Sequence, residues 1–336
     1  MIKEATDILS SGSDLTAGQM GAVMEEILRG KAETPQIVSF LTALSAKGET
    51  VEELTAAVAV MRTHVTRIHT CKPAVLDTCG TGGDVKGTFN ISTAAAFVAS
   101  GAGIIVAKHG NRSLSSRCGS ADILEALGIK INLLPEKIEE ALEAIGIAFL
   151  FAPNLHPAMK YAMPARKEIG KRTIFNILGP LTNPASATHQ LIGVYDRHWV
   201  EILANVLANL GTTHALVVHG EDGMDEITTT SSTLVAEASA SKVKVYKVAP
   251  EEFGIKRARP EDLTGGSASE NAKIILGILN GESTPQRDIV VLNAAAAIYA
   301  ADKAGSIKEG ISLAEKSIDT KKALEKLLRL KEFTNK

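Results

Sequence analysis

The first 70 residues carry apolar side chains at helical spacing and show no alternating pattern that would indicate a strand. Helices are predicted over Thr16–Arg29, Pro35–Lys47 and Thr50–Arg67. Each of the first two ends at a glycine, and the third starts with a capping box in which Thr50 is followed three residues later by Glu53. The N-terminal part of the chain therefore predicts a small all-helical domain.

From Val75 onward, short apolar runs of strand length alternate with segments of helical period. The clearest strand-length runs are Ile104–Ala107, Ile147–Phe151, Leu191–Tyr195 and Ala215–Val218. This alternation is typical of a mainly parallel central sheet covered by helices. The stretch Thr228–Gly254 predicts short antiparallel strands, and helices resume from Ala268. We expect an α/β protein with a small all-helical domain over residues 1–70 and a larger α/β domain over residues 71–336.

A glycine-rich loop, Asp77-Thr-Cys-Gly-Thr-Gly-Gly-Asp84, follows the first apolar run and precedes a helix-like stretch. Bare backbone N–H groups between a strand and a helix suit a phosphate or pyrophosphate. The loop is neither a dinucleotide fingerprint nor a P-loop, and a tight turn is the alternative interpretation. Oxygen- and nitrogen-bearing side chains favour an anion site, and they are supplied by Asp84, Thr88, Asn90, Ser92 and Thr93.

A second polar segment, Lys108-His-Gly-Asn-Arg-Ser-Leu-Ser-Ser116, directly follows the run Gly103–Ala107. We expect a loop at a strand end, and a solvated loop with ordinary charges is the alternative. Ligands of open α/β sheets bind outside the carboxyl ends of the strands, so the two loops are expected to face the same crevice. Together they could surround a phosphorylated group.

Adjacent carboxylates, Asp225 and Glu226, follow another predicted strand and a glycine-containing loop. Carboxylate oxygens are hard ligands that suit Mg²⁺, which commonly binds one or two carboxylates together with substrate phosphates. An isolated pair of this kind is more often a solvated loop pair, and that alternative stays open from the pair alone.

Composition limits the classes of function. A formal net charge of −2 and a pI near 6.5 give no general attraction to nucleic acid or to an anionic membrane. The three cysteines form no C-x-x-C pair and are expected to be reduced thiols. The N-terminus has no signal-peptide pattern, and the apolar stretch Ile289–Ala301 is shorter than the roughly 20 residues of a membrane span. We expect a cytoplasmic protein.

The motifs taken together resemble the anthranilate phosphoribosyltransferase family. The segments that carry the resemblance are the Asp77–Asp84 loop, Asn90-Ile-Ser-Thr93, Lys108-His-Gly-Asn-Arg112, Cys118-Gly-Ser-Ala-Asp122, Arg172-Thr-Ile-Phe-Asn-Ile-Leu-Gly-Pro-Leu-Thr-Asn-Pro184 and Val218-His-Gly-Glu-Asp-Gly-Met-Asp-Glu226. The resemblance implies transfer of the phosphoribosyl group of phosphoribosyl pyrophosphate (PRPP) to anthranilate, a step of tryptophan biosynthesis. It also implies a homodimer, two magnesium ions in each active site, and a return of residues 153–184 to the helical domain.

The resemblance further implies roles for individual residues. Lys108, His109 and Arg166 would be catalytic, with Lys108 acting as a mobile charge on the phosphates. Anthranilate would contact Gly80, Asn111 and Arg166. Magnesium would be held by Ser92, Asp225 and Glu226. The PRPP contacts would be Gly80, Gly83, Asp84, Thr88, Asn90, Ile91, Ser92, Thr93, Lys108, His109, Gly110, Asn111, Arg112, Ser113, Leu114, Ser115, Ser116 and Ser120.

Three other functions were weighed against this one. A pyrimidine-nucleoside phosphorylase of the same architecture also cradles phosphate, but it has no need to hold a magnesium pyrophosphate. A non-catalytic relative that binds nucleic acid would need a basic groove. A scaffold protein would leave the polar loops unexplained. We expect no nucleic-acid or membrane partner.

Overall fold

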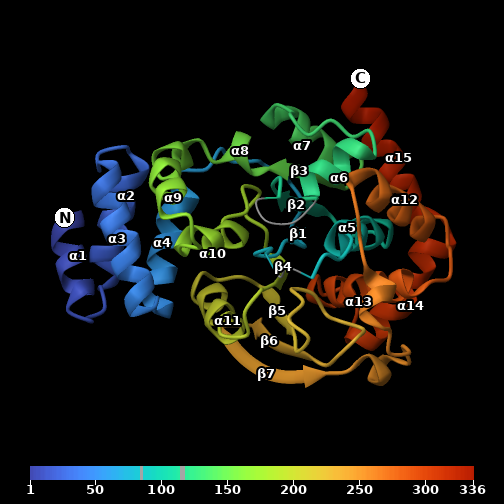
Figure 1. Ribbon diagram of the computed structural model, residues 1–336. Helices are drawn as coiled ribbons and strands as arrows, with labels where there is room; N and C mark the ends of the chain where they lie inside the picture. Colours follow the sequence, from blue (N-terminus) through green and yellow to red (C-terminus); the bar gives the residue numbers. More distant parts are fainter. Residues whose placement is uncertain (84–85, 114–117) are drawn as a thin grey trace.

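The computed structural model describes residues 1–83, 86–113 and 118–336 (Figure 1). The chain begins with four helices, which are α1 (Ile2–Ser10), α2 (Ala17–Leu28), α3 (Thr34–Lys47) and α4 (Val51–Thr63). The capping box predicted at the third segment is confirmed: Thr50 Oγ1 accepts from the Glu53 N–H at 3.2 Å, and Glu53 Oε2 accepts from the Thr50 N–H at 2.8 Å. The carboxylate of Glu53 is fully buried and also accepts from the Leu15 N–H at 2.9 Å, which joins the start of α4 to the turn before α2.

A seven-stranded sheet forms the centre of the part of the chain that the structure describes. Its strands are β1 (Leu76–Asp77), β2 (Val106–Gly110), β3 (Ile147–Phe151), β4 (His189–Gly193), β5 (His214–Gly220), β6 (Thr233–Ser239) and β7 (Lys242–Val248). The order across the sheet is β3-β2-β1-β4-β5-β6-β7, with β1 to β5 parallel and the last two strands antiparallel. The predicted mainly parallel sheet and the antiparallel end are confirmed.

Helices cover both faces of the sheet, and the remaining ones are α5 (Ile91–Gly101), α6 (Ser120–Ala126), α7 (Pro135–Ala144), α8 (Ala152–Leu155), α9 (Met163–Ile169), α10 (Ile174–Leu181), α11 (Trp199–Asn209), α12 (Ala268–Leu279), α13 (Pro285–Ala300), α14 (Ile307–Asp319) and α15 (Lys322–Asn335). Successive strand residues point to opposite faces. Leu191 and Leu216 accordingly join the core with α5 and α13, whereas Ile192 and Val217 join the core with α11.

Residues 152–181 run back to the N-terminal helices, where α9 packs against α3 and α10 packs against α4 (Figure 1). Ala165 of α9 and Phe175 of α10 lie in the same apolar core as Phe40 of α3. The guanidinium of Arg62 donates to Leu181 O at 2.9 Å across 119 positions of the chain. The helical body is therefore built from two distant parts of the sequence.

Two predictions about local structure are wrong. Lys108, His109 and Gly110 belong to β2 instead of a loop, because they pair in register with Phe149, Leu150 and Phe151 of β3. α4 ends at Thr63 and not at Arg67, since the Thr66 N–H donates to Leu155 O at 2.9 Å. Pro180 lies in the last turn of α10.

Within the described ranges, no helix has both the length and the apolar character needed to cross a membrane. α13, which holds the apolar stretch noted in the sequence, is 16 residues long and almost entirely buried between other elements.

Candidate active site

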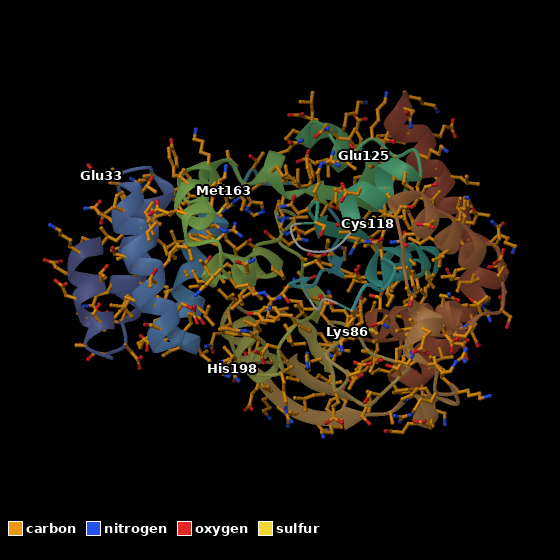
Figure 2. All side chains as sticks on the ribbon, viewed as in Figure 1. Glu33, Lys86, Cys118, Glu125, Met163 and His198 are labelled. Carbon is orange, nitrogen blue, oxygen red and sulfur yellow. The ribbon has the colours of Figure 1, made fainter. Side chains whose placement is uncertain are left out.

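A cleft of about 740 Å³ lies between the helical body and the carboxyl ends of the parallel strands. Figure 2 shows Met163 of α9 on the helical side and Cys118, just before α6, on the other, and both line this cleft. The predicted site residues among its lining are Gly80, Gly83, Thr88, Asn90, Ile91, Ser92, Thr93, Lys108, His109, Gly110, Asn111, Arg112, Ser113, Ser120, Arg166, Asp225 and Glu226. Asp84, Leu114, Ser115 and Ser116 lie outside the described residues.

The glycine loop that follows β1 is tied to the end of β4. The Thr81 N–H donates to Gly193 O at 2.9 Å, and Thr81 Oγ1 accepts from the Tyr195 N–H at 3.1 Å. Helix α5 starts at Ile91, and in its first turn the hydroxyl of Thr93 is buried without a hydrogen-bond partner among the described residues. A buried unpaired hydroxyl is costly, and a ligand oxygen at this helix N-terminus would satisfy it. The loop and the helix start fit an anion.

Lys108 lies at the base of the site, where other groups of the chain already contact its ammonium. Its side chain is buried, and Nζ donates to Thr78 O at 2.6 Å and to Ser92 Oγ at 3.3 Å. Burial lowers the pKa of Lys108, while the nearby carboxylates of Asp77, Glu226 and Asp225 raise it. Two hydrogen-bond acceptors and three nearby carboxylates thus hold the ammonium at the base of the cleft, because a buried cation needs such partners.

His109 forms a pair with His156, which lies between α8 and η1 (Pro157–Tyr161). The two Nε2 atoms are 3.0 Å apart, so one ring donates to the other. Burial lowers the pKa of His109 to about 3 and that of His156 to about 4. Both rings are therefore neutral near pH 7 and bring no positive charge to the cleft.

Asp77, Cys79 and His109 bring their ligand-type atoms within 4.8 Å of one another beneath the cleft floor. The Asp77 carboxylate is already bonded, since it accepts from the His109 N–H at 3.0 Å and from Asn183 Nδ2 at 2.7 Å. Burial raises the pKa of the Cys79 thiol well above its usual value, which disfavours the thiolate that metals and electrophiles require. We interpret this cluster as a support that fixes the backbone of His109.

The carboxylates of Asp225 and Glu226 enter the cleft from the loop after β5. Glu226 Oε1 accepts from the Ser92 N–H at 3.0 Å, which places the pair beside the start of α5. Gly193 makes this approach possible, because a Cβ there would lie only 1.6 Å from Asp225 O. Two carboxylates next to the Ser92 hydroxyl form a set of hard oxygen donors that fits a magnesium ion.

Asp222, four residues before Glu226, holds the carboxylate loop in shape. Its Oδ1 accepts from the Met224 N–H at 3.1 Å, and its Oδ2 accepts from the hydroxyls of Thr228 and Thr230. Asp222 is not among the site residues predicted from the sequence. An Asp that precedes a predicted ligand by a few residues in a glycine-containing loop is the signal that could have indicated it.

Arg166 of α9 faces the same cleft from the helical side. Its guanidinium carbon lies 5.8 Å from the centre of the Phe175 ring, and Nη1 donates to Met163 Sδ at 3.7 Å. Burial lowers the pKa of Arg166, although a guanidinium stays protonated in proteins. A half-buried cation held mainly by apolar neighbours suits a carboxylate ligand.

The polar segment after β2 has its own internal contacts. Arg112 Nη1 is 2.7 Å from both Asp122 and Glu125, so its charge is paired with carboxylates. Ser120 Oγ donates to Asn111 O at 3.2 Å, and the Asn111 side chain accepts from the Arg112 N–H at 2.7 Å. In this arrangement these residues shape the cleft wall.

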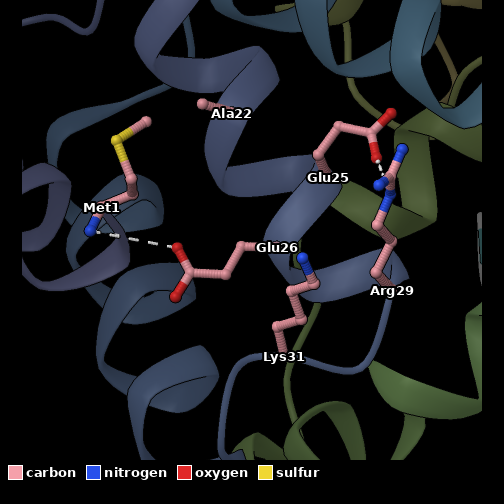
Figure 3. A pocket seen from close by; sticks show the side chains of 6 residues that line it. All are labelled: Met1, Ala22, Glu25, Glu26, Arg29 and Lys31. Atoms are coloured by element: carbon pink, nitrogen blue, oxygen red, sulfur yellow. Dashed lines mark hydrogen bonds and ion pairs between the residues drawn. The ribbon is translucent and has the colours of Figure 1, made fainter.

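A second hollow lies on the helical body and is lined by Met1, Ala22, Glu25, Glu26, Arg29 and Lys31 (Figure 3). Two ion pairs lie in it, since Glu25 bonds Arg29 at 2.7 Å and Glu26 is 4.0 Å from the Met1 amine. None of the predicted site residues lies there.

Comparison with known proteins agrees with this geometry. Residues 72–324 match the glycosyl transferase family a/b domain, and residues 3–65 match the glycosyl transferase family helical bundle domain. The anthranilate phosphoribosyltransferase of Acetivibrio thermocellus is 54% identical over 335 residues, which cover 100% of this chain and 97% of that protein.

Solved structures give the same result. The crystal structure of anthranilate phosphoribosyltransferase from Thermus thermophilus superposes with a TM-score of 0.94 at 42% identity and covers 99% of both chains. The Saccharomyces cerevisiae enzyme in complex with PRPP and Mg has a TM-score of 0.89 at 27% identity, covering 99% of this chain and 98% of that one. The yeast enzyme has also been solved with 4-fluoroanthranilate. The chain belongs to the glycosyl transferase family defined by these two domains and, within it, to the anthranilate phosphoribosyltransferases.

Proposed function

We propose that this chain transfers the 5-phosphoribosyl group of PRPP to the amine of anthranilate, giving N-(5-phosphoribosyl)anthranilate and pyrophosphate in tryptophan biosynthesis. The observation that carries the proposal is the single cleft that joins the glycine loop, the Asp225-Glu226 pair and Arg166. An anion cradle, a set of oxygen ligands and a carboxylate-binding cation are the features that this pair of substrates requires.

The donor would lie along the glycine loop and the first turn of α5. Backbone N–H groups of the loop and the unpaired Thr93 hydroxyl would bind phosphate oxygens, and the fixed Lys108 ammonium would lie beneath them. Asp225, Glu226 and Ser92 would hold two magnesium ions. When bound, magnesium neutralises charge on the pyrophosphate and so makes it a better leaving group.

The acceptor would lie across the cleft, with its carboxylate on Arg166 and further contacts to Gly80 and Asn111. In the transfer, the bond between C1 of the ribose and the pyrophosphate oxygen breaks, and the oxygen keeps the electron pair. The lone pair of the anthranilate nitrogen forms the new bond to C1, and the nitrogen then loses one proton to solvent. An aniline nitrogen is unprotonated at neutral pH, so no general base is assigned, and the neutral His109 would serve to orient the acceptor.

The organisation of the molecule is part of this proposal. We assign a small helical domain to residues 1–70 with the returning segment 153–184, and a PRPP-binding domain to residues 71–336. Arg166 belongs to the first part and the glycine loop to the second, so relative movement of the two would bring the amine to C1. We also propose a homodimer and a cytoplasmic location.

The test follows anthranilate fluorescence in the presence of the purified protein and PRPP, with and without magnesium. A magnesium-dependent loss of fluorescence with release of one equivalent of pyrophosphate is expected. If both substrates stay intact while a pyrimidine nucleoside and inorganic phosphate are consumed, the chain is instead a nucleoside phosphorylase. Size-exclusion chromatography with light scattering checks the dimer in the same preparation.

A further inference from the structure

The charged residues of the cleft differ in what holds them. Lys108 is buried and bonded to Thr78 O and Ser92 Oγ, and Arg112 is paired with Asp122 and Glu125. These two cations are already engaged by the protein.

The cations on the helical side lie against aromatic rings. Lys160 lies over Tyr161 at 4.9 Å, and Arg166 lies over Phe175 at 5.8 Å. Lys160 lies in η1 and Arg166 in α9, across the cleft from the glycine loop. A further cleft-lining cation, Arg172, follows α9 and reaches the loop itself.

The guanidinium of Arg172 lies directly on the glycine loop. Its Nη2 donates to Gly83 O, and its central carbon is 3.5 Å from the centre of the Tyr195 ring. Among the residues that the structure describes, no carboxylate lies within ion-pair distance of this guanidinium. The hydrogen bond to Gly83 uses only part of the donor capacity of an arginine.

The platform beneath Arg172 is itself fixed. Tyr195 accepts a hydrogen bond on its hydroxyl from Trp199 Nε1 at 3.1 Å, and its backbone N–H donates to Thr81 Oγ1 at 3.1 Å. Stacking on an aromatic face orients a planar guanidinium and leaves its edge available for hydrogen bonds. The same tyrosine therefore positions both Arg172 and the loop.

Gly83 permits the close approach of the arginine. Its φ is +83°, and a Cβ at this position would lie 2.6 Å from Arg172 Nη2. A side chain there would both strain the backbone and displace the guanidinium. A glycine at position 83 is therefore needed for the Arg172 guanidinium to lie where it does.

We propose that Arg172 binds the pyrophosphate portion of PRPP and stabilises the negative charge that develops on it. This inference rests on the proposed function. As the bond from C1 to the pyrophosphate oxygen breaks, the electron pair stays on that oxygen, and the guanidinium beside Gly83 offsets the added charge without transferring a proton. Arg172 also joins the segment that follows α9 to the glycine loop. Helix α9 itself carries Arg166.

The test compares Arg172→Gln with Lys171→Gln. Lys171 is the adjacent exposed cation and does not line the cleft, so the two variants lose the same charge at neighbouring positions. We expect Arg172→Gln to raise the KM for PRPP and the Kd for inorganic pyrophosphate about tenfold or more and to lower kcat, because a charge-assisted hydrogen bond is lost. The KM for anthranilate should change less than about threefold, and Lys171→Gln should behave as the unsubstituted protein.

Direct binding separates a charge role from a purely structural one. Calorimetric titration with pyrophosphate at several salt concentrations should give a weaker salt dependence for Arg172→Gln than for Lys171→Gln, since one phosphate contact is missing. Arg172→Lys should recover part of the affinity by restoring charge without the planar fork. Circular dichroism and thermal unfolding check that all variants are folded.

Equal pyrophosphate affinity and equal KM for PRPP in Arg172→Gln and Lys171→Gln would overturn the inference. A change confined to the KM for anthranilate would also overturn it. Failure of the unsubstituted protein to release pyrophosphate from PRPP and anthranilate would contradict the proposed function itself, which makes the two failures distinguishable.

Discussion

The side-chain amide of Asn293 bonds both backbone groups of Ile227, the residue that follows Glu226. Asn293 Nδ2 donates to Ile227 O at 2.8 Å, and Asn293 Oδ1 accepts from the Ile227 N–H at 2.9 Å. Asn293 is fully buried on α13, where it is surrounded by apolar residues. The backbone next to the carboxylate pair is therefore anchored to a core helix.

Replacing Asn293 by Leu should weaken both the fold and the metal site. Leu has the same branched arrangement of four side-chain heavy atoms as Asn, but it would leave two buried backbone groups of Ile227 unpaired, at a cost of about 1–3 kcal/mol each. Urea unfolding should show lower stability, and calorimetry should show weaker magnesium binding in the presence of pyrophosphate. Asn293→Asp should also lose stability, because a buried carboxylate oxygen would then face the carbonyl oxygens of Ile227 and Ile289 in place of a donor. Unchanged stability of Asn293→Leu would contradict this account.

Arg166→Ala should raise the KM for anthranilate about tenfold or more and leave the KM for PRPP nearly unchanged. The reason is that the guanidinium faces the cleft from the helical side, away from the glycine loop. Steady-state kinetics with each substrate varied in turn provide the measurement. Arg166→Lys should show a smaller increase in the KM for anthranilate. If Arg166→Ala changed only the KM for PRPP, the assignment would be wrong.

Asp225→Asn and Glu226→Gln should each raise the magnesium concentration needed for half-maximal activity. The double variant should be little worse than the poorer single one, because both side chains would serve one metal cluster. Chelation with EDTA should abolish turnover, and added magnesium should restore it. Strictly additive effects in a double-mutant cycle would argue for two independent roles.

A second polar cluster lies away from the cleft, around His214 of β5. His214 Nε2 is 3.0 Å from Glu237 Oε1, and Nδ1 is 2.7 Å from Asp302 Oδ1. His189 Nε2 is 3.2 Å from Asp302 Oδ2, and Tyr299 donates to Glu237 Oε1 at 2.6 Å. The cluster fastens the C-terminal end of α13 to the sheet.

The cluster predicts a defined dependence of stability on pH. Burial acts to lower the pKa of His214, but its hydrogen bonds to Glu237 and Asp302 outweigh this effect and raise it. The hydrogen bond from His214 is the main cause that lowers the pKa of Glu237 to about 2. A raised histidine pKa stabilises the fold below about pH 6.5 and loses this effect as the pH rises through the folded-state pKa.

The Glu237 contribution has the opposite direction. It is present above about pH 4.3 and is lost as the pH falls toward about 2. The stability difference between the unsubstituted protein and His214→Gln should therefore be largest between about pH 4.3 and 6.5. Thermal unfolding over a pH series measures this, with His198→Gln, an exposed histidine, as the control. A difference that grew steadily above pH 7 would contradict the assignment.

Periodicity predicted the fold class because it reports which faces are buried. The helical spacing before residue 70 and the alternation after Val75 correspond to the observed helices and parallel strands. The same reasoning placed Lys108 and His109 outside a strand, because charged residues are rare in buried strands. It failed there because Thr78 O and Ser92 Oγ, far along the chain, satisfy the lysine.

The candidate site could be predicted where its chemistry is local, as in the glycine loop and the adjacent carboxylates. Residues that act through tertiary contacts gave no local signal. Asn293 lies within the apolar stretch Ile289–Ala301 and Arg172 lies in a family motif, and the sequence predicted a role for neither. Their partners, Ile227 and Gly83, are brought to them only by the fold.

The contact between Arg62 and Leu181 has a consequence for biosynthesis of the chain. The ribosome delivers α1–α4 first, but their apolar faces are covered by Ala165, Phe175 and α11, all of which emerge much later. The apolar surface of the N-terminal helices therefore stays exposed while about the next hundred residues are synthesised. Folding also becomes slower as the share of such long-range contacts increases. A fragment that stops at the end of α4 would retain Phe40 and Leu54 without their covering layer and is expected to aggregate or to bind chaperones.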